Sequence, residues 1–364
     1  MGPILRIHPG NLNDPIITYR VLNDQPKLVG GKVTKVTIST VARHANVSRQ
    51  TVSNVLNAPE LVREETRARV LAAIEELGYR TNLAARQMRT GRSRLIAVRI
   101  DPPSNGIETS VMDRFLHGLT EASAPAGYRV MLYTATNDED EINTFRELLA
   151  SYSLDAFVLT HTHHGDTRTA WLAEAGVPFT TFGRPWGGLG DHPWVDIDGA
   201  AGTAEATRHL LAAGHERIGF LGWPEGSGVG DDRHSGWARA MHEAGRDVTG
   251  LARHAIDGVA AGERMARQLL RTRRPPTAFV CASDQLALGA RRIGDIDVIG
   301  FDDSPTAEAA GLSSVRQPLR EAAAECVRQL AAQLDKGRIP RPAQPGGRLR
   351  PPPHVLLQPK LVVR

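Results

Sequence analysis

The sequence predicts an α/β protein in which a small helical domain precedes a larger body of doubly wound parallel sheets. Residues 37–81 show helical periodicity with capping residues, whereas short apolar strands alternate with amphipathic helices from residue 95 onward. The length of 364 residues indicates two or three domains. The part after residue 94 is long for one sheet, so we expect it to form two similar lobes.

Composition excludes several classes of protein. A hydrophobic content of 41% supports a sizeable core, unlike that of a disordered chain. Cys281 and Cys326 lie far apart and give neither a disulfide framework nor a metal-binding spacing, which fits a reducing compartment. No apolar run is long enough for a membrane span, and the first residues lack the apolar core of a secretory signal. We therefore expect a cytoplasmic protein without a membrane partner.

The positive charge is concentrated near the N-terminus. The formal net charge of +4 divides into +3 over residues 1–36, +5 over residues 37–94 and −4 over residues 95–364. A basic module on a mildly acidic body is typical of nucleic-acid binding, although solvated helix faces would give the same pattern. Residues 1–36 keep no helical or strand period, so we expect a flexible tail there.

Capping residues delimit three helices in the basic part. Thr37 and Ser48 are suitable N-caps for helices over 38–45 and 49–57. A third helix over 64–77 ends at Gly78. Two short helices joined by a tight turn indicate a helix-turn-helix, which places its second helix in the major groove of DNA. The alternative is a three-helix domain with solvated polar faces.

The second of these helices carries side chains that suit base edges. Arginine bonds guanine in bidentate fashion, glutamine or asparagine bonds adenine, and hydroxyl groups suit phosphates or base edges. The predicted DNA-contacting residues of this domain are Thr37, Ser48, Arg49, Gln50, Thr51, Ser53 and Asn54.

The body alternates between strands and helices, and ligands bind such sheets at the carboxyl ends of the strands. The predicted strands are 95–100, 129–133, 156–160, 179–182, 217–221, 278–281 and 298–301. The predicted helices are 111–126, 139–152, 168–175, 200–213, 233–244, 263–270, 285–293 and 319–336.

Several passages carry a resemblance to a known family. They include ISTVARHANVSRQTVSNVLN, HLLAAGHERIGFLG, PPTAFVCASDQLALGA and LSSVRQPL. The chain closely resembles the lactose-repressor (LacI/GalR) family of transcriptional regulators over about residues 36–364. The resemblance implies a helix-turn-helix domain over 37–81, a hinge helix and linker over 82–94, and a two-lobed effector-binding and dimerisation core over 95–364. That core is related to periplasmic sugar-binding proteins.

The resemblance also assigns roles to individual DNA contacts. Arg49, Gln50 and Asn54 stand at base-reading positions of the family. The hinge helix enters the minor groove in the family, with an apolar wedge between base steps. Met88 stands at the wedge position here, in a segment that also supplies Asn82 and Ala85. The alternative is an ordinary linker turn.

The sequence departs from the family pattern in two places. Arg63 stands where relatives usually have a small capping residue. Residues 291–296 form a short connection, which predicts a shortened helix before them. The resemblance further implies that the second lobe begins near Gly214 and that the chain returns to the first lobe over 313–318.

Candidate effector contacts come from the same resemblance and from strand ends. Arg233 and Asp302 match ligand-binding positions, and a guanidinium and a carboxylate suit vicinal hydroxyls, although a salt bridge between lobes would use the same residues. Asp284 and Asp198 are either ligand contacts or helix caps. Trp223 follows the predicted strand 217–221 and is the best candidate for stacking on a sugar.

Two further loops carry no cofactor assignment. The histidine-rich loop 161–164 follows a strand end and is either a ligand or interlobe contact or a solvated loop; no acidic or cysteine partner is fixed by spacing. The glycines of residues 226–230 are spaced G-x-G-x-G, which departs from the dinucleotide-binding motif. We therefore predict neither a metal nor a cofactor.

Together these observations predict a cytoplasmic, homodimeric transcriptional repressor. Its partners would be a pseudo-palindromic double-stranded DNA operator, as dimer symmetry requires, and a small-molecule effector, a mono- or disaccharide. A sugar-binding protein without a regulatory role is the main alternative, and the N-terminal motif argues against it. The second alternative is an α/β enzyme. It lacks support because the sequence shows no P-loop, metal cluster or Ser/His/Asp order. The effector's identity, its direction of action and the operator sequence stay open.

Overall fold

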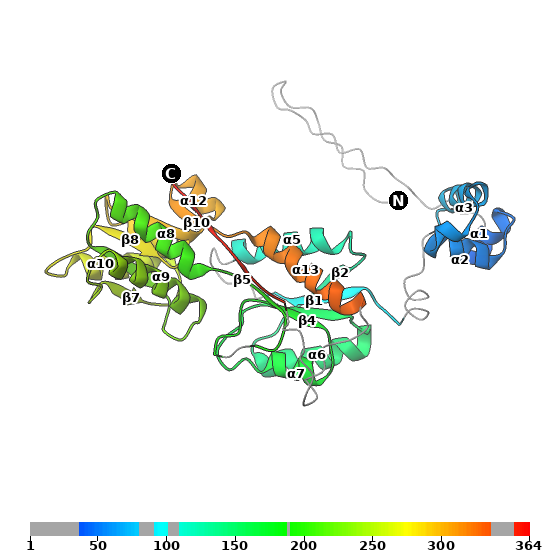
Figure 1. Ribbon diagram of the computed structural model, residues 1–364, viewed down its shortest axis with the longest axis horizontal. Helices are drawn as coiled ribbons and strands as arrows, with labels where there is room; N and C mark the ends of the chain where they lie inside the picture. Colours follow the sequence, from blue (N-terminus) through cyan, green and yellow to red (C-terminus); the bar gives the residue numbers. More distant parts are fainter. Residues whose placement is uncertain (1–35, 80–90, 101–108, 188–189, 336–352) are drawn as a thin grey trace, which may run out of the picture. The chain divides into compact units, whose positions relative to one another are not determined.

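The computed structural model describes residues 36–79, 91–100, 109–187, 190–335 and 353–364 (Figure 1). The predicted tail and hinge helix lie outside the described residues. Internal contacts divide the chain into two compact units, Met1–Asn82 and Leu83–Arg364.

The first unit holds the three predicted helices. Thr37 and Ser48 cap the first two: the Thr37 hydroxyl accepts a hydrogen bond from Thr40 N at 3.4 Å, and the Ser48 hydroxyl accepts one from Thr51 N at 3.0 Å. Gly78 ends the third helix in the left-handed region at φ 61°, whereas Arg63 makes no side-chain cap. The elements are α1 (Ile38–His44), α2 (Arg49–Asn57), the 3-10 turn η1 (Pro59–Leu61) and α3 (Glu64–Leu77).

A small apolar core holds these helices together. Val52 and Val55 turn one face of α2 inward against Val41 of α1 and Val70 of α3. Burying each such side chain stabilises the fold by roughly 1.5–3 kcal/mol. Because the apolar side of α2 is buried in this core, its polar side faces solvent.

The second unit contains two six-stranded sheets. The first has the order β11-β5-β4-β3-β1-β2 and is parallel throughout; the second has the order β12-β10-β9-β8-β6-β7 and is parallel except where β12 pairs with β10. The strands of the first sheet are β1 (Leu95–Arg99), β2 (Arg129–Tyr133), β3 (Ala156–Leu159), β4 (Phe179–Phe182), β5 (Trp194–Ile197) and β11 (His354–Leu357). Those of the second are β6 (Ile218–Gly222), β7 (Ala252–His254), β8 (Ala278–Cys281), β9 (Asp297–Asp302), β10 (Ser313–Arg316) and β12 (Lys360–Val362).

Helices cover both sheets. In the first lobe α5 and α13 lie side by side on one face, and α6 and α7 cover the other (Figure 1). In the second lobe α8 packs on α9, and α10 packs on α11. The bounds are α5 (Thr109–Ser123), α6 (Asp138–Tyr152), α7 (Arg168–Glu174), α8 (Gly199–Ala212), α9 (Val229–Glu243), α10 (Val259–Leu270), α11 (Asp284–Arg291), α12 (Pro305–Ala309) and α13 (Leu319–Asp335).

The chain crosses between the lobes three times, after β5, after β10 and after β11. The predicted return over 313–318 is confirmed, since β10 belongs to the second sheet and α13 packs on the first. The predicted start of the second lobe near Gly214 is wrong. Helix α8 already packs on α9 and on the second sheet, so the second lobe begins at Gly199.

The predicted doubly wound class is confirmed, but five strands escape the sequence patterns. Strands β5 and β10 carry polar residues within four-residue segments, and β7 has only three residues. Strands β11 and β12 lie at sheet edges, where burial imposes no apolar run. The shortened helix expected before residues 291–296 is α11, which ends at Arg291.

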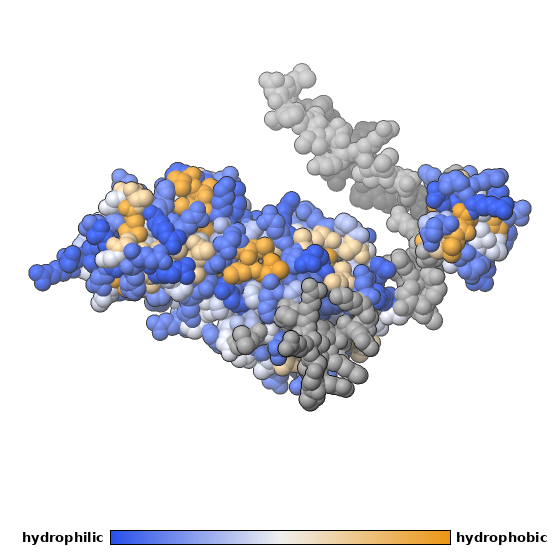
Figure 2. Space-filling view, viewed as in Figure 1, coloured by the Kyte–Doolittle hydropathy of each residue, from blue (hydrophilic) through white to orange (hydrophobic). Residues whose placement is uncertain are grey.

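The described surface is largely hydrophilic in the view of Figure 2, with separate apolar patches. Of the large hydrophobic side chains in the described ranges, Ile256 is the most exposed, at 81%. No helix in the described ranges is both long and apolar enough to cross a membrane.

A glycine allows the closest helix contact beside Arg233. A Cβ added to Gly236 on α9 would lie 2.0 Å from the carbonyl oxygen of Ala200 on α8. No side chain fits there without moving one helix. The R-x-x-G spacing therefore places Arg233 three residues before Gly236, the glycine that the packing of α8 on α9 requires.

We predict that Gly236→Ala lowers the free energy of unfolding by about 1–3 kcal/mol, because the added methyl group overpacks the interface between α8 and α9. Urea unfolding followed by circular dichroism measures this. Ser235→Ala, on the exposed side of the same helix, is the control. Equal stabilities of the two variants would contradict the prediction.

Candidate functional site

A cavity of about 690 Å³ opens at the carboxyl ends of both sheets. The strand order reverses between β1 and β3 in one sheet and between β6 and β8 in the other, which is where doubly wound sheets bind ligands. From the first lobe, the polar lining consists of Asp113, Thr160, His161, Thr162 and Asp196. From the second lobe it consists of Ser227, Arg233, Asp257, Gln285, Asp302 and Gln317. The apolar wall includes Met112, Leu116, Phe182, Trp223, Ile256 and Phe301.

Arg233 is buried at the base of this cavity. Its guanidinium carbon lies 3.7 Å from the ring centroid of Phe301 and 5.0 Å from that of Trp223, so two aromatic rings lie within cation–π distance of it. Its Nη1 donates to the carbonyl oxygen of Ala282 at 2.5 Å and lies 3.6 Å from Asp302 Oδ1. Its Nε is buried without a hydrogen-bond partner among the described residues. Burial lowers the pKa of Arg233, against the attraction of Asp302.

Asp302 is the last residue of β9 and faces Arg233. Its Oδ1 accepts a hydrogen bond from Gln317 Nε2 at 2.6 Å, and 16% of the side chain is exposed. Burial raises the pKa of the Asp302 carboxyl to about 7; Arg233 lowers it, while Asp284 and Asp257 raise it further.

The backbone at this point is strained. Asp302 has φ 111° and Asp303 has φ 48°, values that cost a residue with a side chain about 1–3 kcal/mol each. Arg114 of α5 donates to the carbonyl oxygens of both residues, and Arg316 and Arg364 hold the Asp303 carboxylate. These contacts stabilise the conformation that presents Asp302 to the cavity.

Asp284 and Asp198, both predicted effector contacts, are not among the residues that line the cavity. Asp284 is buried away from the lining; its two oxygens accept hydrogen bonds from Ser304 N at 2.7 Å and from the Ser314 hydroxyl at 2.5 Å. Asp198 caps α8, with Ala201 N donating to it at 2.8 Å. Asp198 therefore takes the capping role that the sequence left open, whereas Asp284 does not cap its own helix: Ser283 caps α11, and Asp284 ties that helix to Ser304 and Ser314.

Sequence reasoning missed Asp257 and Gln317. Asp257 follows β7 and Gln317 follows β10, two strands that the patterns did not predict. Had those strands been recognised, the strand-end rule would have found both residues. Of the histidine-rich loop, His161 and Thr162 line the cavity, and His161 has φ 56°.

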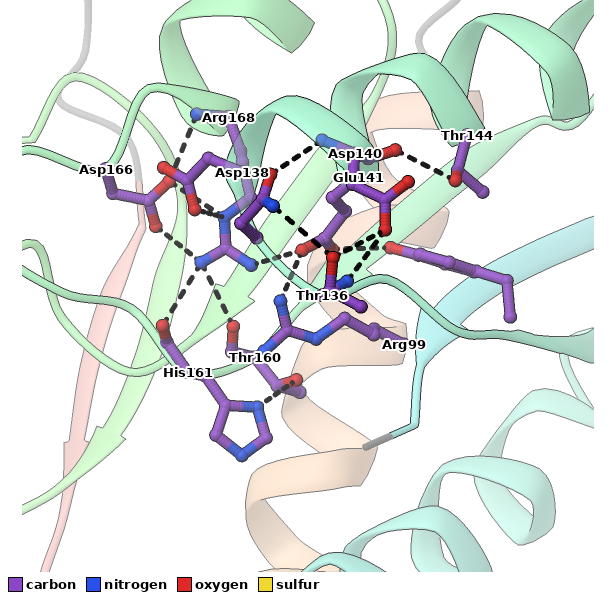
Figure 3. Close-up of polar contacts among 12 residues, drawn as sticks. Arg99, Thr136, Asp138, Asp140, Glu141, Thr144, Thr160, His161, Asp166 and Arg168 are labelled. Atoms are coloured by element: carbon purple, nitrogen blue, oxygen red, sulfur yellow. Dashed lines mark hydrogen bonds and ion pairs between the residues drawn. The ribbon is translucent and has the colours of Figure 1, made fainter. Parts of the chain in front are cut away.

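A buried ion network holds that loop in place (Figure 3). Arg168 is fully buried and donates to Glu141 at 2.8 Å, to Asp166 at 2.7 Å and to the carbonyl oxygens of Thr160 and His161 at 3.2 Å each. Its carboxylate partners raise the pKa of Arg168 despite the desolvation that opposes them. Because an uncompensated buried charge costs several kcal/mol, the network constrains the loop to this position.

Glu141 joins this network to two further strands. It accepts hydrogen bonds from Arg99 at 2.6 Å and from the Tyr133 hydroxyl at 2.8 Å, and it is fully buried itself. The first lobe therefore anchors its cavity loop through β1, β2 and α6 together (Figure 3).

One cluster has the residue types of a metal site. Ligand atoms of Asp138, His163 and Asp166 lie within 4.8 Å of one another. However, the Arg168 guanidinium already lies 3.5 Å from Asp138 and 2.7 Å from Asp166. A cation thus neutralises both carboxylates, and we assign no metal to them.

The polar side of α2 forms the candidate DNA-contacting surface. Arg49 and Gln50 are exposed, whereas Thr51, Ser53 and Asn54 are partly exposed. Gln50 Nε2 donates to Asn54 Oδ1 at 2.9 Å, so the two amides pair across one turn. The exposed Thr37 and Ser48 cap α1 and α2. The predicted hinge contacts Asn82, Ala85 and Met88 lie outside the described residues.

A helix-turn-helix unit and a two-lobed core with a ligand-sized cavity define a class: DNA-binding regulators that respond to a small molecule. Residues 37–82 match the family of bacterial regulatory proteins called lacI, and residues 207–364 match the periplasmic binding protein-like domain. The HTH-type transcriptional regulator AglR of Rhizobium meliloti is 34% identical over 322 residues, which cover 84% of this chain and 90% of AglR. This chain belongs to the LacI family.

Solved structures agree with this assignment. The transcriptional regulator CelR–cellobiose complex is 29% identical, with a TM-score of 0.64, and the match covers 90% of this chain and 99% of that one. The lac repressor dimer bound to operator and the anti-inducer ONPF is 25% identical, with a TM-score of 0.71 and coverage of 90% and 97%. The chain is therefore a DNA-binding transcriptional regulator with a small-molecule effector.

We predict that Asp302→Asn removes a pH-dependent loss of stability. The unfolded carboxyl ionises near pH 4 and the native one near pH 7, so its stabilising contribution is fully present below pH 4 and is lost as the pH rises through 7. The melting temperature of the variant minus that of the parent should therefore increase from pH 5 to pH 8. A difference that stays constant over this range would contradict the raised pKa.

Proposed function

We propose that this chain is a cytoplasmic repressor that binds a pseudo-palindromic operator as a homodimer and responds to a mono- or disaccharide. The observation that carries the effector assignment is the Arg233–Asp302 pair beside Trp223 and Phe301 at the base of the cavity. We further propose that the protein has no catalytic activity of its own.

Sugars match this combination of groups. Their hydroxyls both donate and accept hydrogen bonds, which suits a carboxylate, a guanidinium and the Gln317 amide within one cluster. Their C–H faces suit aromatic walls such as Trp223, the predicted stacking residue. The volume falls in the range of about 300–1,000 Å³ typical of small-molecule sites, and CelR, which is similar to this chain, forms a complex with cellobiose.

The DNA-binding half of the proposal rests on α2. Its exposed Arg49 and its Gln50–Asn54 pair have the chemistry of major-groove readout. A two-fold symmetric dimer presents two such helices to two half-sites, and the similar lac repressor binds its operator as a dimer. We propose that Asn82, Ala85 and Met88 act in the minor groove between the half-sites.

Effector and operator would be coupled through the three crossings. A ligand that contacts residues of both lobes favours one arrangement of the lobes over another. If operator-bound and free states differ in that arrangement, the ligand changes DNA affinity by the difference in its affinity for the two states.

We predict that Arg233→Lys abolishes the rise in melting temperature that a disaccharide such as cellobiose or maltose causes, because an ammonium can neither stack on the Phe301 ring as a planar guanidinium does nor bond in bidentate fashion. A thermal-shift assay measures this. Arg239→Lys, on the exposed side of the same helix, should keep the shift. A retained shift in Arg233→Lys would remove Arg233 from the site.

We predict that Arg49→Ala weakens operator binding by about 1–3 kcal/mol, whereas the affinity of the protein for random duplex changes far less. The reason is that contacts to bases discriminate between sequences and contacts to phosphates do not. Fluorescence anisotropy with an operator selected from a random library measures both affinities. Arg67→Ala on α3, where Glu64 pairs with the arginine, is the control. Equal losses on both duplexes would contradict a base-reading role.

A further inference from the structure

We propose that the cavity selects its effector by charge: it accepts an uncharged polyhydroxyl ligand and rejects the anionic form of the same ligand. Asp257, acting with Asp302, is the residue that imposes this selection. The inference rests on the proposed sugar-binding function and deepens it, because it separates plain sugars from sugar acids and sugar phosphates.

The charged groups of the lining are mainly acidic. Among the described lining residues, Asp113, Asp196, Asp257 and Asp302 carry carboxylates, against the single guanidinium of Arg233. Asp196 is neutralised from outside the lining, because Arg184 Nε donates to it at 2.5 Å. Asp113 is largely exposed and lies beside His117, so Asp257 and Asp302 are the two lining carboxyl groups left to act on the Arg233 guanidinium.

The charge of Arg233 is already compensated. Asp302 and then Asp257 are the negative charges that act on it most strongly, its Nη1 also donates to Ala282 O, and the rings of Phe301 and Trp223 lie 3.7 and 5.0 Å from its guanidinium carbon. An anionic ligand would therefore approach the Asp257 carboxylate, joined by that of Asp302 above about pH 7, without gaining an unpaired cation. Like charges repel strongly where the surroundings exclude water.

The unfilled hydrogen-bonding positions indicate hydroxyl groups. Among the described residues, Oδ2 of Asp257 and Oδ2 of Asp302 accept no hydrogen bond, so a ligand must donate to them. Trp223 Nε1 and Arg233 Nε are buried donors without an acceptor among the described residues, so an oxygen that reaches either one would accept a hydrogen bond from it. A hydroxyl both donates and accepts without charge, whereas a carboxylate or a phosphate dianion only accepts.

Asp257 is held in a fixed position. Its Oδ1 accepts a hydrogen bond from the Ser283 hydroxyl at 2.5 Å, and the same hydroxyl caps α11 by accepting from Leu286 N at 3.2 Å. The neighbouring Ile256 is largely exposed at the cavity wall. The carboxylate therefore stays at the ligand's side of the loop after β7.

A disaccharide and two derivatives of it, one charged and one uncharged, test the proposal. A thermal-shift panel of maltose, cellobiose and trehalose identifies the disaccharide that the full chain binds. Calorimetry then compares the analogue of that sugar in which one C6 is a carboxylate with the analogue in which it is an uncharged carboxamide. We expect the carboxylate to bind at least about 30-fold more weakly than the carboxamide, or about 2 kcal/mol.

Two variants test whether Asp257 imposes the charge selection. Asp257→Asn keeps the oxygen that accepts from Ser283 and removes the charge, so the carboxylate-to-carboxamide ratio of Kd should fall at least about fivefold. Asp295→Asn removes a charge from the exposed surface of the same lobe and should leave the ratio unchanged. Because each ratio compares two ligands on one protein, a loss of stability does not mimic the effect.

Each outcome bears on a separate statement. If the carboxylate and the carboxamide bind the parent protein equally, charge selection is wrong while the sugar-effector function stands. If Asp257→Asn and Asp295→Asn change the ratio alike, the role of Asp257 is wrong. If no panel disaccharide and no monosaccharide such as glucose or galactose binds, the proposed sugar-effector function is overturned, together with this inference.

Discussion

The site depends on one topological constraint: two parallel sheets reverse their strand order and direct their carboxyl ends toward one cavity. Parallel strands bring their carboxyl ends to the same edge, so residues distant in the chain, such as Thr160, Asp257 and Asp302, become neighbours. Three crossings of the chain connect the sheets, so each lobe is built from two separate stretches of the sequence. A ligand in the cavity therefore contacts both lobes at once.

Buried charges then shape this cavity. Arg168 in the first lobe and Arg233 in the second are both buried, but their surroundings differ. Arg168 has carboxylates and carbonyl oxygens on every donor side, which makes it a structural anchor. Among the described residues Arg233 Nε has no acceptor, and the guanidinium lies over the Phe301 ring beside a strained Asp302, an arrangement with hydrogen-bonding capacity left.

The sequence predicted the features that depend on local chemistry. Thr37, Ser48 and Gly78 delimit helices because capping needs only a few neighbouring residues. Apolar runs predicted the central strands such as β3 and β8, which are buried on both faces. The resemblance to a family added Arg233 and Asp302, which local patterns alone could only place near strand ends.

Tertiary structure alone decided which strand-end residues meet. Asp257 and Gln317 follow strands too short or too polar to show a period, and β-sheet pairing with distant segments creates those strands. The same holds for Asp284 and Asp198, where a carboxylate beside a helix start suits a cap and a ligand equally until the surrounding fold is known. Sequence by itself thus determined the class of protein and its helix ends, because those follow from local and periodic chemistry. The lining of the cavity required the fold, because it is made of contacts between residues far apart in the chain.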